Sequence, residues 1–229
     1  MAKLILIRHG QSVWNLKNVF TGWTNVELSE NGVEEAKRAG QALKNANISF
    51  DVAFTSLLKR AVHTFNIVAQ TCDLDWVELH KTWRLNERHY GALQGLNKAE
   101  VAAKHGEEQV HIWRRSYDVR PPLLSDSDKR NPKFDPMYGH LDASCLPLGE
   151  SLKDCIARTM PYWYDMIAPN LINGKSCIVA AHGNSLRGLV KYLENIGDSE
   201  ISNLEIPTGV PIVYDFDKNL KILGKSVLK

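Results

Sequence analysis

The sequence has few cysteines and no long apolar run. No two cysteines form a CxxC pair, and none has a histidine near it at a metal-ligand spacing. The four are Cys72, Cys145, Cys155 and Cys177. We expect reduced, buried thiols and a cytoplasmic location. The first apolar run, Leu4 to Ile7, stops at Arg8, far short of a signal sequence or of the roughly 20 residues of a membrane span. We therefore expect a soluble protein with no membrane partner.

An excess of charge of one sign is also missing. The 229 residues contain 28 Lys and Arg against 26 Asp and Glu, a formal net charge of +2. Global charge therefore argues neither for nor against nucleic acid, and the tryptophans have no basic groove beside them that would make a base-stacking platform. We expect no nucleic-acid partner. With 44% hydrophobic and 24% charged residues, the chain is typical of a globular protein with a sizeable core.

Short apolar or β-branched runs alternate with helical patterns along the chain. The expected strands are Lys3–Ile7, Val52–Phe54, Trp76–Leu79, Cys177–Ala181 and Ile212–Phe216. Ser29, Ser56, Asn97 and Ser151 are expected to begin helices, and a last helix runs from near Asn184 to Gly197. Pro161 is expected to bend the helix that contains it. This alternation predicts a three-layer α/β fold: a mainly parallel central sheet with helices on both faces.

One stretch, from Arg120 to Pro147, breaks this alternation. It is rich in Pro, Asp, Ser and Lys, and its centre reads "RPPLLSDSDKRNPKFDP". A strand and a helix of the earlier pattern follow it, so we interpret residues 120–147 as a surface excursion inserted in a single domain of residues 1–229. Loops of this length in compact domains are commonly functional covers or disordered segments.

Two histidines follow two of the expected strands in the same way. "LILIRHGQSVWN" ends its apolar run in Arg8, His9 and Gly10, and "SCIVAAHGNSLRG" ends its run in His182 and Gly183. Ligands of open α/β sheets bind beyond the carboxyl ends of the strands, so both rings should emerge at one site. The amides of both glycines and the following helix starts are expected to point at an anion there.

Cations gather at the same expected site. Arg8 adjoins His9, and Arg60 lies in the first turn after the strand that ends in "FTS". Guanidinium groups match phosphate oxygens, a neutral imidazole can attack phosphorus, and a protonated one can stabilise the charge that develops. Glu87, in "RLNERHYG", is the candidate proton donor and acceptor. Lys98, Arg114 and Arg115 form a second cationic patch for a substrate with two anionic ends.

Six ordered blocks carry a family resemblance. They are "RHGQSVWN", "FTGW", "TSLLKRAVHT", "ERHYGALQGLNK", "WRRSYDVRPP" and "AAHGNSLRG". The first contains the RHG signature of the histidine phosphatase superfamily, and together, from about residue 3 to about residue 217, they resemble cofactor-dependent phosphoglycerate mutases. The resemblance implies a phosphoglycerate mutase-like fold and an isomerase of glycolysis and gluconeogenesis. It would interconvert 3-phosphoglycerate and 2-phosphoglycerate, primed by 2,3-bisphosphoglycerate and without a metal.

The resemblance also implies residue roles. His9 would be the phosphorylated nucleophile, Glu87 the proton donor and acceptor, and His182 the stabiliser of the transition state. Arg8 and Arg60 would act with them. Residues that match the family's substrate contacts are Arg8, Ser12, Asn15, Thr21, Gly22, Arg60, Glu87, Arg88, Tyr90, Lys98, Arg114, Arg115, Gly183 and Asn184.

The sequence departs from the family pattern at two places and leaves rival functions open. Gln11 replaces the usual glutamate, and the chain ends in "GKSVLK" without the longer lysine-bearing tail of many relatives. Rival functions are a phosphatase of the same superfamily acting on a small phosphate ester, a non-catalytic anion-binding module and a metallophosphatase. Relatives form monomers, dimers and tetramers, and of these we expect a homodimer.

Overall fold

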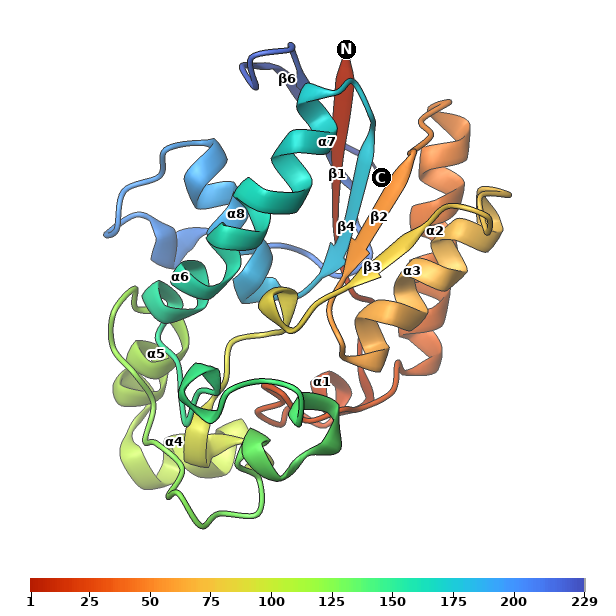
Figure 1. Ribbon diagram of the computed structural model, residues 1–229. Coiled ribbons are helices and arrows are strands. Elements are labelled where there is room, and N and C mark those ends of the chain that lie inside the picture. Colours follow the sequence, from red (N-terminus) through yellow and green to blue (C-terminus); the bar gives the residue numbers. More distant parts are fainter. Residues whose placement is uncertain (229) are drawn as a thin grey trace.

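The computed structural model describes residues 1–228 as a six-stranded sheet between helical layers (Figure 1). The spatial order is β3-β2-β4-β1-β5-β6. The strands are β1 (Ala2–Arg8), β2 (Val52–Thr55), β3 (Leu79–Lys81), β4 (Cys177–Ala181), β5 (Ile212–Phe216) and β6 (Ile222–Val227). The first four strands in this order pair in parallel, and β5 pairs antiparallel with β1 and β6. The mainly parallel sheet predicted from the sequence is confirmed.

Helices cover both faces of this sheet. They are α1 (Val13–Leu16), α2 (Glu30–Asn45), α3 (Lys59–Thr71), α4 (Lys98–His105), α5 (Glu107–Arg115), α6 (Leu152–Tyr162), α7 (Ala168–Ile172) and α8 (Gly183–Leu193). Figure 1 shows α2 and α3 on one side and α6, α7 and α8 on the other. A π-helical turn, Trp163–Ile167, joins α6 to α7 and begins two residues after Pro161, which lacks an N–H for the helical ladder.

Side chains of β1 alternate between the two layers, as the two-residue period of a strand requires. Leu4 and Leu6 belong to the core beneath α6 to α8, whereas Ile5 and Ile7 belong to the core beneath α2 and α3. All four are fully buried. The strand is therefore apolar on both faces until Arg8, where it leaves the sheet.

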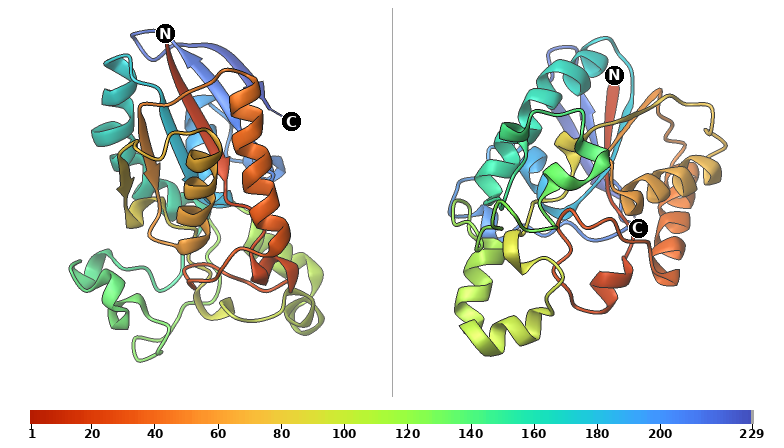
Figure 2. Two further views of the ribbon diagram at one scale, coloured as in Figure 1. Left: turned by 90° about the vertical axis from the view of Figure 1, so that its right-hand side faces the viewer. Right: turned by 60° about the horizontal axis from the view of Figure 1, so that its bottom comes forward.

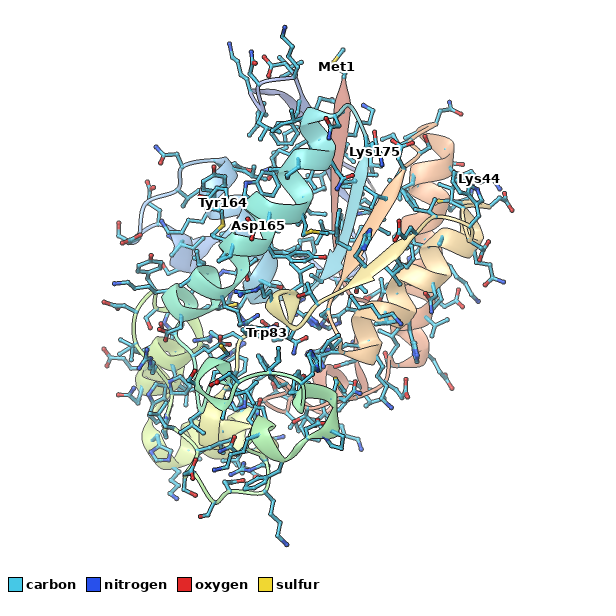
Figure 3. All side chains as sticks on the ribbon, in the orientation of Figure 1. Met1, Lys44, Trp83, Tyr164, Asp165 and Lys175 are labelled. Carbon is cyan, nitrogen blue, oxygen red and sulfur yellow. The ribbon has the colours of Figure 1, made fainter. Side chains whose placement is uncertain are left out.

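The carboxyl ends of the parallel strands lie at the lower edge of the sheet in Figure 1. Met1 and Lys175 mark the opposite edge, and Trp83 lies near the lower one (Figure 3). In the left view of Figure 2, α4 and α5 extend beyond this lower edge on one side and residues 120–147 on the other. The additions to the sheet are thus concentrated where its parallel strands end.

Several element boundaries differ from the sequence-based expectations. The third strand is Leu79–Lys81 rather than Trp76–Leu79, and Trp76 is largely exposed before it. Helix α8 ends at Leu193 rather than Gly197, because Asn195 adopts a positive φ of 51°. The edge strand β6 was not predicted, since exposed positions dominate it and its apolar alternation is short.

Two side-chain expectations also needed correction. Ser56 does not cap α3, whose N-cap is Leu58, because the Ser56 hydroxyl faces His182 instead. All four cysteines are free, but only Cys155 and Cys177 are buried; Cys145 is exposed. Ser29, Asn97 and Ser151 do cap the helices that follow them. No helix among residues 1–228 is long and apolar enough to cross a membrane.

Candidate active site

A cavity of about 140 Å³ opens at the carboxyl ends of the parallel strands. It is lined by thirteen residues that the sequence analysis singled out. These are Arg8, His9, Asn15, Thr21, Gly22, Arg60, Glu87, Tyr90, Lys98, Arg114, Arg115, Gly183 and Asn184. Six are Arg, Lys or His and one is Glu, so the cavity suits an anionic ligand.

Strand register places His9 beside His182. Arg8 of β1 pairs with Ala181 of β4, and the His9 N–H donates to the Ala181 carbonyl at 2.9 Å. The residue after each strand is therefore a histidine at the same level of the sheet. The centroids of the two imidazole rings are 5.0 Å apart.

His9 is held as a neutral imidazole with its Nε2 lone pair directed at Arg60. Its Nδ1 lies 2.7 Å from the Gly10 carbonyl, an acceptor, so Nδ1 carries the proton. The Arg60 Nε donates to His9 Nε2 at 3.3 Å. Burial, then the charges of Arg60 and Arg8, hold the pKa of His9 well below its usual range. Such an imidazole is unprotonated at neutral pH and can act as a nucleophile.

His182 lies behind His9 and does not line the cavity itself. Its Nε2 is 2.8 Å from the Ser56 hydroxyl, whereas its buried Nδ1 has no hydrogen-bond partner among the described residues. Burial first, and then the charges of Arg60, His9 and Arg8, hold the pKa of His182 well below its usual range. His182 is therefore a neutral imidazole at neutral pH.

The buried guanidinium of Arg60 is fixed by the loop before α2. Its Nη1 and Nη2 donate to the carbonyls of Thr24 at 2.9 Å and Gly22 at 2.8 Å. Gly22 has a φ of +51°, and a Cβ there would lie 2.0 Å from Gln94 Oε1, so this turn requires glycine. Burial lowers the pKa of Arg60 to about 10, which leaves it a cation at neutral pH.

The amide of Gly10 does not point into the cavity as expected. Its N–H donates to the Thr64 hydroxyl of α3 at 3.1 Å. A Cβ on Gly10 would lie 2.1 Å from the Gly32 carbonyl of α2, so glycine allows this close packing. Side-chain cations, rather than this backbone amide, supply the positive potential next to His9.

Glu87 reaches the cavity from the loop that follows β3. The residue is buried, with 8% of its surface exposed. Oε1 accepts the backbone N–H of Arg88 at 2.7 Å, the backbone N–H of Asn184 at 3.1 Å and the Asn184 side-chain amide at 2.9 Å. Asn184 lies in the first turn of α8, and His182 is the N-cap of that helix. The start of α8 therefore positions both His182 and the amide groups that contact Glu87.

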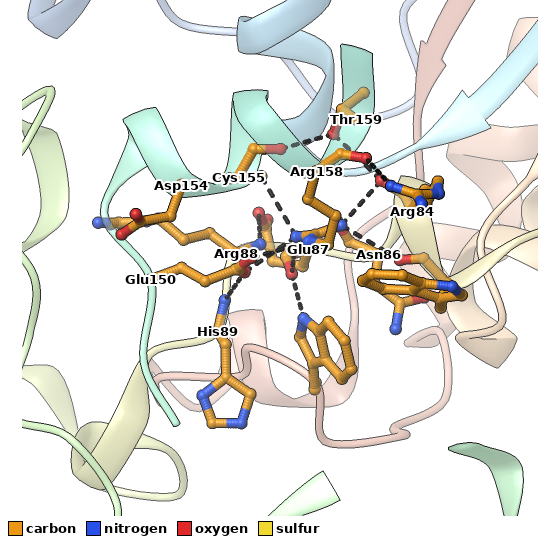
Figure 4. A network of polar contacts seen from close by, with 12 residues as sticks. Arg84, Asn86, Glu87, Arg88, His89, Glu150, Asp154, Cys155, Arg158 and Thr159 are labelled. Carbon is orange, nitrogen blue, oxygen red and sulfur yellow. Dashed lines mark hydrogen bonds and ion pairs between the residues drawn. The ribbon is translucent and has the colours of Figure 1, made fainter. Parts of the chain in front are cut away.

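A buried ion pair clamps the loop that carries Glu87 (Figure 4). The Arg158 guanidinium in α6 forms a bidentate pair with Glu150, with contacts of 2.7 and 2.9 Å. The same guanidinium also donates to four backbone carbonyls of this loop, which are those of Trp83, Arg84, Asn86 and Glu87. Both charged side chains are nearly inaccessible, and Glu150 in turn accepts the His89 N–H at 2.8 Å. Arg158 and Glu150 thus fix the backbone beneath the Glu87 carboxylate.

The second cationic patch spans α4 and α5. Lys98 and Arg114 line the cavity, and Arg115 does so while paired with Glu205. Burial, and next the charge of Arg114, lower the pKa of Lys98. The Arg88 guanidinium stacks over the Tyr90 ring at 4.4 Å; burial alone would raise the pKa of Tyr90, but the Arg88 charge and hydrogen bonds lower it overall. Cations from α4 and α5 therefore line the cavity together with Arg8 and Arg60.

Three of the sequence-predicted residues lie next to the cavity rather than on its wall. Ser12 caps α1 and exchanges hydrogen bonds with Asn15. Arg88 is buried with two guanidinium nitrogens, Nε and Nη1, without partners. His182 is the third. Residues that line the cavity but were not predicted are Val19, Phe20, Arg187, Glu205 and Ile206.

Residues 120–147 do not contribute to the described wall of the cavity. They are anchored by Tyr138, whose buried ring lies 4.8 Å from the Trp23 ring and whose hydroxyl accepts the Asn86 side-chain amide at 2.8 Å. Trp23 Nε1 donates to the Glu87 carbonyl at 2.6 Å. The excursion therefore supports the Glu87 loop from behind. Among residues 1–228 there is no group of three His, Cys, Asp or Glu that could hold a metal ion.

Comparisons with known proteins agree with this architecture. Residues 4–130 match the histidine phosphatase superfamily (branch 1). Among solved structures, a mycobacterial glucosyl-3-phosphoglycerate phosphatase has a TM-score of 0.71 at 23% identity, covering 94% of this chain and 93% of its own. YhfR of Bacillus stearothermophilus has a TM-score of 0.73 at 19% identity, covering 97% and 94%. At these identities the likeness shows the fold.

Two curated relatives are much more similar in sequence. The 2,3-bisphosphoglycerate-dependent phosphoglycerate mutase 2 of Lactiplantibacillus plantarum is 60% identical over 228 residues, which is 100% of this chain and 99% of that protein. The 2,3-bisphosphoglycerate-dependent phosphoglycerate mutase of Treponema denticola is 56% identical, over 99% of this chain and 92% of that protein. The chain belongs to the histidine phosphatase superfamily and, within it, to the family of 2,3-bisphosphoglycerate-dependent phosphoglycerate mutases.

Proposed function

We propose that this protein interconverts 3-phosphoglycerate and 2-phosphoglycerate through a phosphohistidine at His9, primed by 2,3-bisphosphoglycerate. The observation that carries the proposal is the state of His9: buried, neutral, with Nδ1–H on the Gly10 carbonyl and an unprotonated Nε2 that accepts a long hydrogen bond from Arg60. The full-length similarity to two mutases supports this substrate class.

The residues of the cavity fit a doubly phosphorylated primer. Buried guanidinium nitrogens of Arg8 and Arg88 have no partner among the described residues, and Lys98 and Arg114 add positive charge to the cavity wall. Unpaired buried donors are costly unless a ligand satisfies them, so they indicate anion sites. When bound, 2,3-bisphosphoglycerate supplies the first transferable phosphoryl group. Arg8, Arg60 and Lys98, which line the cavity, would hold its oxygens.

His9 and Glu87 carry out the transfer in this proposal. His9 Nε2 forms a bond to phosphorus while the phosphorus–oxygen ester bond breaks, and Glu87 gives its proton to the departing oxygen. In the return step Glu87 takes the proton of a substrate hydroxyl as that oxygen attacks the phosphohistidine. Glu87 is thereby restored as an acid and His9 as a free imidazole.

The arginines and His182 stabilise the charge of the transferring group. Arg8 and Arg60 lie beside His9, where their fixed charge would favour the transition state of the transfer. An anion in the cavity would offset the cations that hold His182 neutral, so we expect His182 to take up a proton when the phosphoryl group arrives.

A phosphatase of the same superfamily is the alternative function. It differs in the acceptor, since water rather than a glycerate hydroxyl would take the phosphoryl group from His9. The cationic patch of Lys98, Arg114 and Arg115 favours the mutase, because it can hold the carboxylate end of an acceptor. We also propose a single domain over residues 1–229, a homodimer, a cytoplasmic location, and no nucleic-acid or membrane partner.

Two measurements test the function. Intact-mass analysis after brief exposure to 2,3-bisphosphoglycerate should show one added phosphoryl group in the parent and in His63→Asn, an exposed-histidine control, but none in His9→Asn. An assay from 3-phosphoglycerate should yield 2-phosphoglycerate in excess over inorganic phosphate. Dominant phosphate release would replace the mutase by the phosphatase. Absence of the phosphoryl group with unchanged turnover in His9→Asn would contradict both.

A further inference from the structure

We propose that Arg187 positions Glu87 through the side chain of Asn184, and that Glu87 carries its transferable proton on Oε2. This inference rests on the proposed function, in which Glu87 is the proton donor and acceptor. Arg187 lies in the middle of α8, lines the cavity and has no role in the steps above.

The hydrogen bonds of Glu87 distinguish its two oxygens. Three N–H groups converge on Oε1: the backbone amides of Arg88 and Asn184 and the side-chain amide of Asn184. A proton on Oε1 would face these donors, so Oε1 is the oxygen that stays unprotonated. Oε2 lies on the side of Gly183, 3.7 Å from where a Cβ of that residue would be, and accepts no hydrogen bond among the described residues. The proton therefore belongs on Oε2.

The orientation of the Asn184 amide is what directs the third donor to Oε1. Its Nδ2 lies 2.9 Å from Glu87 Oε1 and 3.3 Å from the Tyr90 hydroxyl, and its Oδ1 accepts the Arg187 Nη1 at 3.0 Å. Turning the amide over would place Oδ1 against the carboxylate and the NH₂ against the guanidinium. Because both contacts would be repulsive, Arg187 fixes the amide in the observed orientation.

The placement of Arg187 is unfavourable apart from these contacts. The side chain is 4% exposed, Nη2 donates to the Ile201 carbonyl at 2.5 Å, and Nε has no partner among residues 1–228. Burial, followed by the charges of Arg115 and Arg88, lowers the pKa of Arg187 to about 10, so it is still a cation at neutral pH. A buried cation among other cations needs a compensating contact, and the Asn184 carbonyl oxygen provides one.

The alternative is that Arg187 only ties α8 to the turn at Ile201. Lys191 of the same helix offers a matched control, because its Nζ donates to the Ile196 carbonyl at 2.5 Å and pairs with Asp198 without contacting Asn184. A residue that merely tethers α8 should behave like Lys191. A residue that acts through Asn184 should lose its effect when Asn184 is removed.

A double-mutant cycle on turnover separates these roles. Arg187→Met and Asn184→Ala should each lower kcat by about 10–100-fold, the effect of a misplaced catalytic group, while KM changes less than about threefold in Arg187→Met. The double variant should be no slower than the slower single variant. Arg187→Lys, which keeps a cationic donor toward Oδ1, should recover most of the loss, and Lys191→Met should retain the parental kcat. Additive losses, or an unchanged kcat in Arg187→Met, would overturn the proposal.

A structure of Glu87→Gln tests the proton position independently of turnover. The glutamine amide mimics the protonated carboxyl group, so its oxygen should occupy the Oε1 position beneath the three N–H groups and its NH₂ the Oε2 position. A hydrogen-bond network that requires the reverse assignment would refute the inference. This test does not depend on whether Arg187→Met folds. Failure of the parent to form 2-phosphoglycerate would instead reject the proposed function on which this inference rests, whereas a reversed amide with normal formation of 2-phosphoglycerate would reject the inference alone.

Discussion

Removal of the Arg158 guanidinium offers the strongest test of the network beneath Glu87. In Arg158→Met, the Glu150 carboxylate would lose its bidentate partner in a site where its side chain is only 4% exposed. Breaking a buried ion pair from one side costs about 3–5 kcal/mol, because the other charge is left uncompensated. At about 2–4 °C per kcal/mol for a chain of this size, the melting temperature should fall by roughly 6–20 °C.

Two further variants show whether burial is the cause. Arg120→Met removes a bidentate partner of Asp154, but the Arg120 side chain is 57% exposed, so less than about 1 kcal/mol should be lost. The double variant Arg158→Met/Glu150→Met leaves no buried charge and should recover part of the stability.

Guanidinium chloride unfolding measures the stability of each variant, and turnover from 3-phosphoglycerate reports on Glu87. Arg158→Met should lose kcat even at temperatures where it is folded, because the Glu87 carbonyl would keep only the Trp23 hydrogen bond. A loss of stability no larger than that of Arg120→Met would refute the reasoning.

Three more predictions concern pH, backbone and metal. Burial, then the charges of Arg158 and Arg130, lower the pKa of His89 to about 3, so its contribution to stability is complete above about pH 6.5 and is lost as the pH falls toward 3. Between pH 5 and pH 7 the unfolding free energy should therefore rise more steeply in the parent than in His89→Gln, by up to about 1.4 kcal/mol per pH unit. Gly22→Ala should lower both the melting temperature and kcat, because its Cβ would overlap Gln94 and move the carbonyl that holds Arg60. Gly106 has a φ of +87° and open space around it, so Gly106→Ala should lower only the melting temperature. Turnover should be unchanged by a chelator, since arginines supply the positive charge; a loss that added metal restores would contradict this.

The sequence predicted the parts of the site that come directly after strands. His9 and His182 follow two apolar runs, and adjacent parallel strands bring such positions together without any further information. Boundaries were less predictable where tertiary packing decides them. Ser56 has the composition of a helix cap, but its hydroxyl faces His182 in the folded chain.

Arg187 could not be recognised from the sequence. It lies three residues after Asn184, a spacing at which side chains on a helix are neighbours. Exposed cations on helices have the same spacing from their neighbours, so the spacing does not reveal that Arg187 is buried. Its burial depends on Ile201, which arrives from a later turn and accepts its Nη2 hydrogen bond. The Arg158–Glu150 pair was missed for the same reason. Its two residues are eight apart in the sequence, and their burial depends on packing against the loop that carries Glu87.

The alignment of β1 with β4 has a practical consequence for refolding studies. Slipping one strand by a single residue would invert which side chains face each layer and would carry His9 away from Ala181. A misaligned molecule could retain much of its helix content and still be unable to accept a phosphoryl group. Stoichiometric labelling of His9 would therefore count the correctly aligned molecules in a sample, which circular dichroism cannot do.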